Sequence, residues 1–364
     1  MLKGPRRLSL AGALLLLAAP GLQAQETIQQ WQFQPGDSGY ELVLADVPMP
    51  TAGANEVLVR VHANSLNRRD LLMLNNQYGP GGSASGGIPL SDGAGEVIAV
   101  GAGVTRFAVG DRVAGIFFSE WLDGKRDADK IASARGGGAT GMLAEVIVSH
   151  EDGLVHIPDH LSYEQAATLP CAGVTAWVVL FKQGNLQPDD YVLLEGTGGV
   201  SSLGLVFAAA AGARPIITSS SDQKLEQASA LGAFGTVNYR SNENWQQEVR
   251  ALTGGVGVDH VLEVGGSDTL QKALQAVAYD AHIGLIGGLS GFAPSIPVGT
   301  MMQLGVDASG IYVGSRADFE AMNAFIEEHE IVPAVGAVFD FENAPAAFDF
   351  MDNGSYFGKI VISR

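Results

Sequence analysis

A glycine-rich turn directly after an apolar strand constrains this chain more than any other feature. Residues 191–195 are mostly apolar and end in the turn sequence GTGGVS at residues 196–201, after which a helical pattern begins. We expect Gly196 to permit the tight turn and Gly198 to let the backbone approach a pyrophosphate, which the amides of the helix would bind. Ser201 stands where such turns have a third glycine, and it is small enough for close helix–strand packing. The turn predicts a dinucleotide site.

Apolar strands alternate with helical segments after residue 161. The expected strands span residues 191–195, 216–218, 236–239, 258–264, 283–286 and 310–313. A helix is expected over 222–231, and capping boxes starting at Ser162 and Ser315 predict two more. Continuous apolar strands that alternate with helices indicate a parallel sheet covered on both faces. We therefore expect an α/β fold with a doubly wound parallel six-stranded sheet.

The chain before residue 161 has a different pattern. Residues 57–61 and 96–100 alternate in polarity, and glycines at 101, 103 and 110 mark turns, so this part is expected to be mostly short strands. A length of 364 residues is typical of two domains.

Composition excludes some partners and sites. The chain has 39 acidic and 21 basic residues, for a formal net charge of −18, so we expect no nucleic-acid partner. Cys171 is the only cysteine, which excludes an intramolecular disulfide and a multi-cysteine zinc site. Beyond the first 25 residues, no apolar stretch approaches the roughly 20 residues of a bilayer span, so none is expected in the mature chain.

Residues 1–25 have the three-part plan of a secretory signal peptide. Basic residues at 3, 6 and 7 precede an apolar run over 8–19, and Ala24 precedes a candidate cleavage point. We expect a periplasmic or otherwise exported protein. The alternative is a cytoplasmic protein that keeps this segment.

The end of the second strand bears on the choice of dinucleotide. An acidic residue there would bind the ribose hydroxyls of NAD, but this chain has Ser219. Lys224 follows on the next helix, and Tyr239 lies near the end of the third strand. Hydroxyl groups and a cation suit the 2′-phosphate of NADP. We therefore expect NADP, with NAD as the alternative.

Further motifs occur in order along the chain. They are NRRD at residues 67–70, PLSDGAGEV at 89–97, FxVGDRV at 107–113, ATLPCAGVTAW at 167–177, DxVxExGG at 259–266 and FGKIV at 357–361. With the glycine turn, they resemble the medium-chain dehydrogenase/reductase superfamily, in its zinc-independent, quinone-oxidoreductase-like or alcohol-dehydrogenase-like branch, over about residues 30–364. The resemblance implies a GroES-like catalytic domain over 26–160, a Rossmann NAD(P)-binding domain over 161–314 and a return to the catalytic domain over 315–364. It also implies an active site in the cleft between the domains, and a homodimer.

The resemblance also identifies where zinc-dependent relatives hold their metal. The matching positions are Asn67, Ser91 and Cys171. An amide and a hydroxyl are poor ligands for catalytic zinc, which binds three N, S or carboxylate donors. We therefore expect no metal site.

Hydride transfer to a carbonyl or an activated double bond builds negative charge on oxygen, which needs a stabilising donor. The candidate catalytic residues are Asn67, Arg69, Asp70 and Tyr78. Asn67 would donate through its amide, Arg69 would stabilise an enolate, and Asp70 would orient Arg69 or stay structural. Either Tyr78 or water would supply a proton. The expected cofactor-binding residues are Thr175, Gly196, Gly198, Gly199, Val200, Ser219, Lys224, Tyr239, Val264, Gly265, Gly287, Gly314, Ser315 and Lys359.

These features together favour an NADPH-dependent, zinc-independent oxidoreductase acting on a small carbonyl, enone or quinone, or on the corresponding alcohol. The alternatives are a non-catalytic or sensor NADP-binding protein and an alcohol dehydrogenase that recruits a metal. The sequence does not identify the substrate.

Overall fold

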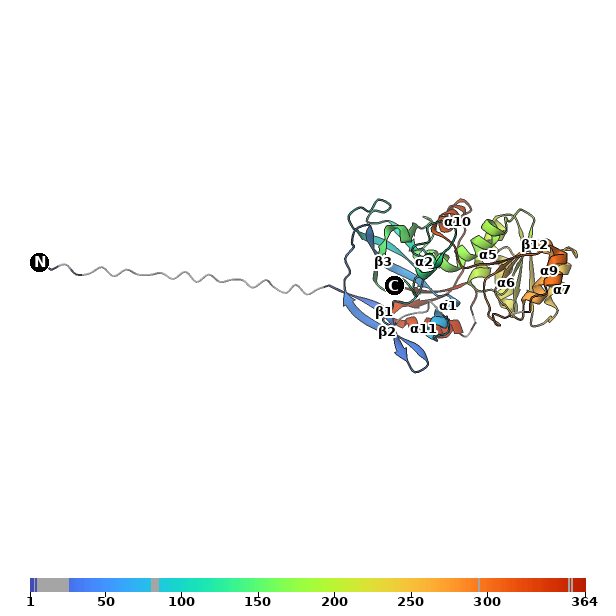
Figure 1. The fold of residues 1–364 in the computed structure, drawn as a ribbon, viewed down its shortest axis with the longest axis horizontal. Helices are drawn as coiled ribbons and strands as arrows, with labels where there is room; N and C mark the ends of the chain where they lie inside the picture. Colours follow the sequence, from blue (N-terminus) through green and yellow to red (C-terminus); the bar gives the residue numbers. More distant parts are fainter. Residues whose placement is uncertain (3, 5–25, 80–84, 294, 353, 355) are drawn as a thin grey trace.

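The computed structural model describes the chain except residues 3, 5–25, 80–84, 294, 353 and 355, so the expected leader lies outside the described residues (Figure 1). Two large sheets lie side by side. The first has six parallel strands in the order β10-β9-β8-β11-β12-β13. Its strands are β8 (Tyr191–Leu194), β9 (Arg214–Ser219), β10 (Gly235–Asn238), β11 (Val258–Glu263), β12 (Val277–Leu285) and β13 (Asp307–Gly310). This confirms the expected doubly wound sheet.

Helices cover both faces of this sheet. They are α5 (Gly199–Ala210), α6 (Asp222–Ala230), α7 (Trp245–Leu252), α8 (Leu270–Ala276) and α9 (Val298–Leu304). Neighbouring residues of β8 enter different cores: Leu194 packs in a cluster with Phe207 of α5, whereas Leu193 packs in one with Trp245 of α7. The strand is apolar without alternation because both its faces are buried.

The last two strands differ from their expected positions. β12 begins six residues before the expected 283. Its first part contains the exposed residues Tyr279 and Asp280, which interrupt the apolar run, so the apolar pattern did not indicate the start of the strand. β13 ends at Gly310, where the sixth strand was expected to begin. Residues 311–313 are apolar for another reason, because they form the crossing from this sheet to the other domain, where Ile311 and Val313 are buried and Tyr312 is half-buried.

The second large sheet has seven strands, mainly antiparallel, in the order β14-β15-β3-β4-β5-β7, with β6 paired to β3. Its strands are β3 (Glu56–Ser65), β4 (Asp92–Val100), β5 (Arg112–Gly115), β6 (Val146–His150), β7 (Leu154–His156), β14 (Val335–Asp340) and β15 (Lys359–Ser363). A separate hairpin contains β1 (Thr27–Gly36) and β2 (Gly39–Pro48). β15 pairs antiparallel with β3, so the end of the chain completes a sheet begun before residue 65. This is the expected GroES-like β domain.

The remaining helices accompany this domain or connect it to the parallel sheet. They are α1 (Arg68–Leu74), α2 (Ala128–Ala132), α3 (Tyr163–Ala166), α4 (Val174–Trp177), α10 (Arg316–Glu328) and α11 (Ala344–Asp352). Both expected capping boxes are present, at the starts of α3 and α10. No helix in the described part of the chain has the length and apolar character needed to cross a membrane.

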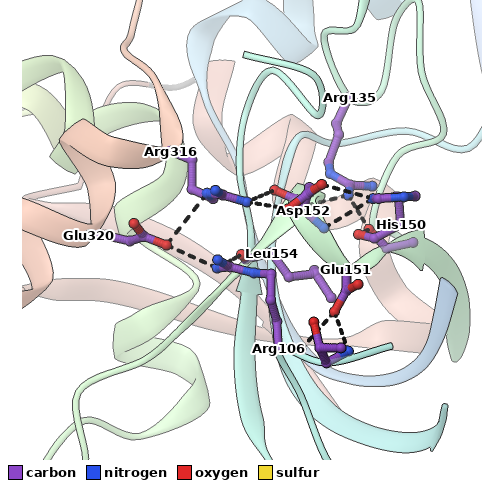
Figure 2. Close-up of polar contacts among 11 residues, drawn as sticks. Arg106, Arg135, His150, Glu151, Asp152, Leu154, Arg316 and Glu320 are labelled. Carbon is purple, nitrogen blue, oxygen red and sulfur yellow. Dashed lines mark hydrogen bonds and ion pairs between the residues drawn. The ribbon is translucent and has the colours of Figure 1, made fainter. Parts of the chain in front are cut away.

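Helix α10 is attached to the β domain by charged side chains (Figure 2). Arg316 Nη1 donates to Asp152 Oδ1 at 2.6 Å, and Arg106 Nη2 donates to Glu320 Oε1 at 2.9 Å. Arg316 and Glu320 lie on α10, whereas Arg106 and Asp152 belong to the β domain. Because α10 directly follows the crossing segment, these contacts help to fix the position of residues 311–315.

Candidate active site

The phosphate loop, residues 196–201, has the geometry expected from its glycines. Gly196 has a φ of +73°, which glycine adopts without strain, and Ser201 Oγ donates to the carbonyl of Glu195 at 2.7 Å. A Cβ added to Gly196 or Gly198 would meet no atom within 4 Å, so the loop faces open space. This space lies at the start of α5, where free amides bind a pyrophosphate. The residues present therefore fit a dinucleotide.

The residues expected near the adenosine ribose lie at one edge of the sheet. Ser219 ends β9, and its carbonyl accepts the N–H of Tyr239 at 3.0 Å. Lys224 follows on α6, where its Nζ donates to a backbone carbonyl at 2.8 Å and partial burial lowers its pKa. Asp222, at the start of the same helix, accepts a hydrogen bond from the side-chain amide of Asn238. Ser219, Lys224 and Tyr239 therefore lie at this edge of the sheet together with the carboxylate of Asp222.

Asn67, immediately before α1, is fixed by Lys359. Nζ of Lys359 donates to Asn67 Oδ1 at 2.6 Å and to the carbonyl of Leu66 at 2.5 Å. The stem of Lys359 lies across the phosphate loop, where a Cβ on Gly199 would be 2.5 Å from its Cδ. Asn67 Nδ2 is buried and has no hydrogen-bond partner among the described residues. The amide is thus oriented with its donor side available to a ligand.

Arg69 lies buried beside two aromatic rings. Its guanidinium carbon is 5.1 Å from the ring centroid of Tyr78 and 4.7 Å from that of Phe117, and Nη1 donates to the carbonyl of Arg135 at 3.0 Å. Burial opposes its charge, but Asp70 and Tyr78 raise the pKa of Arg69 overall, so it remains a cation. Nε and Nη2 are buried and make no hydrogen bond within the described chain. Such a cation is well suited to bind a negatively charged oxygen.

Asp70 supports its neighbours. Its Oδ2 accepts the N–H of Asn67 at 2.7 Å, and its Oδ1 lies 3.6 Å from Arg69 Nη1. Burial raises the pKa of Asp70 to about 6, and the charge of Arg69 partly offsets this effect. Asp70 therefore binds the backbone at the start of α1 and lies close to the charge of Arg69.

A second tyrosine completes the cluster. The hydroxyls of Tyr78 and Tyr312 lie 2.8 Å apart, and the ring of Tyr312 also packs against Phe117 and Phe118. Burial and the bond to Tyr78 raise the pKa of Tyr312, which keeps its proton. The sequence did not single out Tyr312, because it lies in an apolar run and meets Tyr78 only through the fold.

The three positions that match zinc ligands have other partners. Asn67 Oδ1 is held by Lys359, and Ser91 Oγ donates to Asp92 Oδ1 at 2.7 Å. Burial raises the pKa of the Cys171 thiol, which disfavours the thiolate that binds metal. Within the described ranges, no three His, Cys, Asp or Glu side chains are grouped so that they could hold a metal ion.

The other expected cofactor residues have different surroundings. Thr175 Oγ1 donates to the carbonyl of Cys171 at 2.7 Å, and the N–H groups of Val264 and Gly265 point to a buried carboxylate of Glu195. Ser315 caps α10 through Asp318 and is buried. Gly287 and Gly314 are packing positions in this structure: a Cβ would lie 2.8 Å from the carbonyl oxygen of residue 264 and 2.7 Å from the side chain of residue 174, respectively. Val200 lies in the first turn of α5, beside the loop.

Comparison with known proteins identifies the family. The family model for an alcohol dehydrogenase GroES-like domain matches residues 53–159, and the model for a zinc-binding dehydrogenase matches residues 199–328. The chain is 41% identical to a zinc-type alcohol dehydrogenase-like protein of Schizosaccharomyces pombe, over 84% of this chain and 90% of that protein. It is 34% identical to a quinone oxidoreductase of Pseudomonas aeruginosa, over 76% and 79% of the two chains.

A solved structure of an NAD-dependent alcohol dehydrogenase agrees. It superimposes with a TM-score of 0.83 at 31% identity, covering 92% of this chain and 99% of the other. The phosphate loop, the two domains and these relatives together show that the chain is an NAD(P)-dependent oxidoreductase of the medium-chain dehydrogenase/reductase superfamily.

Proposed function

We propose that this protein uses NADPH to reduce a small carbonyl, enone or quinone without zinc, with oxidation of the corresponding alcohol as the reverse reaction. The observation that supports this most is the group of buried donors near the phosphate loop. Asn67 Nδ2 and two guanidinium nitrogens of Arg69 are buried and unpaired among the residues that the structure describes. Unpaired buried donors are costly unless a ligand satisfies them. Relatives described as alcohol dehydrogenase-like and as a quinone oxidoreductase support the substrate class.

In this proposal the side chains have separate roles. A dinucleotide held at the phosphate loop, residues 196–201, would supply the hydride. Asn67 and Arg69 donate hydrogen bonds to the substrate oxygen, on which negative charge develops. The hydroxyl of Tyr78 gives the proton that completes the reduction, and its neighbour Tyr312 orients it through the 2.8 Å contact. Lys359 acts as a positioning residue for Asn67.

The donors at the three zinc-matching positions support a reaction without zinc. One is an amide whose oxygen already binds an ammonium, one is a hydroxyl bonded to a carboxylate, and one is a buried thiol. A cation bound beside Asn67 would also meet the positive charge of Lys359. This set fits catalytic zinc poorly.

The first prediction concerns this metal. Protein dialysed against a strong chelator should keep its rate of NADPH oxidation with a panel of aldehydes, enones and quinones, and metal analysis should find far less than one zinc per chain. One zinc per chain together with chelator-sensitive turnover would instead support a metal-recruiting alcohol dehydrogenase. Tight NADPH binding with no turnover on the whole panel would favour a sensor.

The second prediction tests the amide oxygen and the amide nitrogen of Asn67 separately. Asn67→Asp keeps an oxygen for Lys359 but removes the unpaired donor, so kcat should fall by about 10² or more. The affinity for NADPH should change by less than about threefold, because the phosphate loop is unaltered. Arg68→Ala is the control, since Arg68 is the exposed neighbour and pairs only loosely with Asp352 at 3.6 Å. Full turnover by the Asn67→Asp variant would remove Asn67 from the reaction.

The third prediction tests the choice of dinucleotide. The Nζ of Lys224, which now donates to a backbone carbonyl, can donate to a 2′-phosphate instead. A hydrogen bond to a charged group contributes about 1.5–3 kcal/mol. Lys224→Ala should therefore lower the NADPH-to-NADH affinity ratio by about tenfold or more, as measured by fluorescence titration. Lys272 is another half-buried lysine whose Nζ donates to a backbone carbonyl, and Lys272→Ala should leave the ratio unchanged. An unchanged ratio in the Lys224 variant would favour NAD.

We also propose a homodimer that forms at the β13 edge of the parallel sheet. β13 is the last strand of that sheet, and none of the residues of the neighbouring helix α9 is buried. Large apolar side chains are exposed on and before α9, namely Leu289, Phe292, Ile296, Val298 and Met302. Several large exposed apolar side chains beside a strand edge are typical of an interface.

Export remains a proposal as well. We propose that residues 1–25 direct the protein out of the cytoplasm and that the chain is cleaved after Ala24, as the basic start, apolar run and small residues of this segment indicate.

The fourth prediction covers assembly and export in one measurement. Protein purified from the native host and measured by native mass spectrometry should have the mass of two chains that begin at Gln25. A single-chain mass would contradict the dimer. Chains that still contain residues 1–24 would contradict removal of the leader.

A further inference from the structure

Two buried carboxyl groups lie directly beside the phosphate loop. Glu195 follows β8 and Glu263 ends β11, and these strands are neighbours in which Leu194 pairs with Leu262. Both residues are buried, with exposures of 4% and 1%, and the N–H of Gly265 lies 3.4 Å from Glu195 Oε2 and 2.8 Å from Glu263 Oε1, so the two carboxyl groups are neighbours. Within the described chain no lysine, arginine or histidine forms an ion pair with either. Two negative charges buried together without a cation are strongly unfavourable.

The hydrogen bonds around the pair indicate which carboxyl is ionised. Glu263 Oε1 accepts two backbone N–H groups, each at 2.8 Å, and the hydroxyl of Thr269 at 2.6 Å. Glu195 Oε2 accepts only two long bonds, of 3.3 and 3.4 Å, from the N–H groups of Val264 and Gly265. Three short bonds stabilise a negative charge on Glu263, so the proton belongs on Glu195.

One oxygen of each carboxyl is left over. Glu195 Oε1 and Glu263 Oε2 are both buried, and neither has a donor among the described residues. Two carboxylates are acceptors only and cannot satisfy each other, whereas a protonated acid can donate to its ionised partner. Burial raises the pKa of Glu195 well above its ordinary value, and the charge of Glu263 raises it further.

The pair is connected to the backbone that surrounds the dinucleotide site. Glu195 immediately precedes Gly196, and its carbonyl accepts the hydroxyl of Ser201 from the first turn of α5. Glu263 binds the N–H groups of residues 265 and 266 through its side chain, and Glu195 reaches the N–H groups of residues 264 and 265. A change in the distance between the two carboxyls would therefore move the phosphate loop relative to the end of β11.

We propose that Glu195 and Glu263 share one proton, and that the hydrogen bond this proton makes between them positions the phosphate loop and residues 264–266 for dinucleotide binding. Both are thus positioning residues. The proposal rests on dinucleotide binding itself and does not depend on the choice between NADP and NAD or on the substrate.

The proposal has a definite pH direction. Loss of the shared proton places two adjacent negative charges next to the site of an anionic pyrophosphate, so dinucleotide affinity falls as pH rises through the raised pKa of the pair. The stabilisation of the folded protein by this proton is complete below the ordinary pKa of glutamate. It is lost as the pH rises through the raised pKa of the pair. Three hydroxyls lie close to the pair: Thr269 donates to Glu263 Oε1, Ser201 donates to the backbone carbonyl of Glu195, and Thr218 accepts the N–H of Gly196. None of these hydroxyls titrates in this range.

The fifth prediction compares the full-length protein with Glu195→Gln. The glutamine amide donates the same hydrogen bond to Glu263 without titrating, so its Kd for NADH and for NADPH should match wild type within about threefold at pH 6. At pH 9 the variant should bind about tenfold more tightly than wild type, whose affinity has fallen. Glu226→Gln, an exposed acid on α6, is the matched control and should follow wild type at every pH. Parallel pH profiles for wild type and Glu195→Gln would overturn the proposal.

A second measurement needs no variant. Titration calorimetry of wild type with NADH, in buffers of different ionisation enthalpy, should detect proton uptake on binding that grows as the pH rises. NADH is the probe because it has no 2′-phosphate to titrate. Binding without proton exchange up to pH 9 would overturn the shared proton even if the variant failed to fold. If the proposed preference for NADP were wrong, only the affinity for NADPH relative to NADH would differ from expectation, so the two failures can be told apart.

Discussion

One buried ammonium group connects the parts of this active site. Lys359 starts β15, its stem crosses the phosphate loop at Gly199, and its Nζ binds Asn67 and the carbonyl of Leu66. Asp92 lies 3.7 Å away and balances the charge. A buried cation is tolerated only with such partners, so the positions of the C-terminal strand, the loop and helix α1 depend on one another. The rest of the site is arranged around this contact.

The patterns that the sequence predicts correctly are local. The glycine turn, the capping boxes at Ser162 and Ser315 and most of the parallel strands follow from neighbouring residues, because backbone conformation and helix capping depend on short-range contacts. The candidate residues Asn67 and Arg69 came from the motif at residues 67–70, and Tyr78 follows within the same short segment, where its ring lies 5.1 Å from the guanidinium carbon of Arg69.

What the sequence could not show are contacts between distant residues. Tyr78 and Tyr312 are 234 positions apart, and nothing near Tyr312 distinguishes it from a core residue. In the sequence, Glu195 only marks the end of an apolar strand. Its closeness to Glu263 follows from the pairing of β8 with β11, which the sequence does not show. The sixth strand was misplaced for a similar reason, since residues 311–313 are apolar because of what they pack against at the crossing.

The distance along the chain between Asn67 and Lys359 has a consequence for protein synthesis. When Asn67 leaves the ribosome, its partner is 292 residues away, which corresponds to roughly 15–60 s of translation at about 5–20 residues per second. During that interval β3 lacks β15, its neighbour in the sheet, and the parallel sheet can fold first between the two parts of the catalytic domain. In the nascent chain, residues 56–60 of β3 can already pair with β6, but residues 63–65 wait for β15 until the end of synthesis.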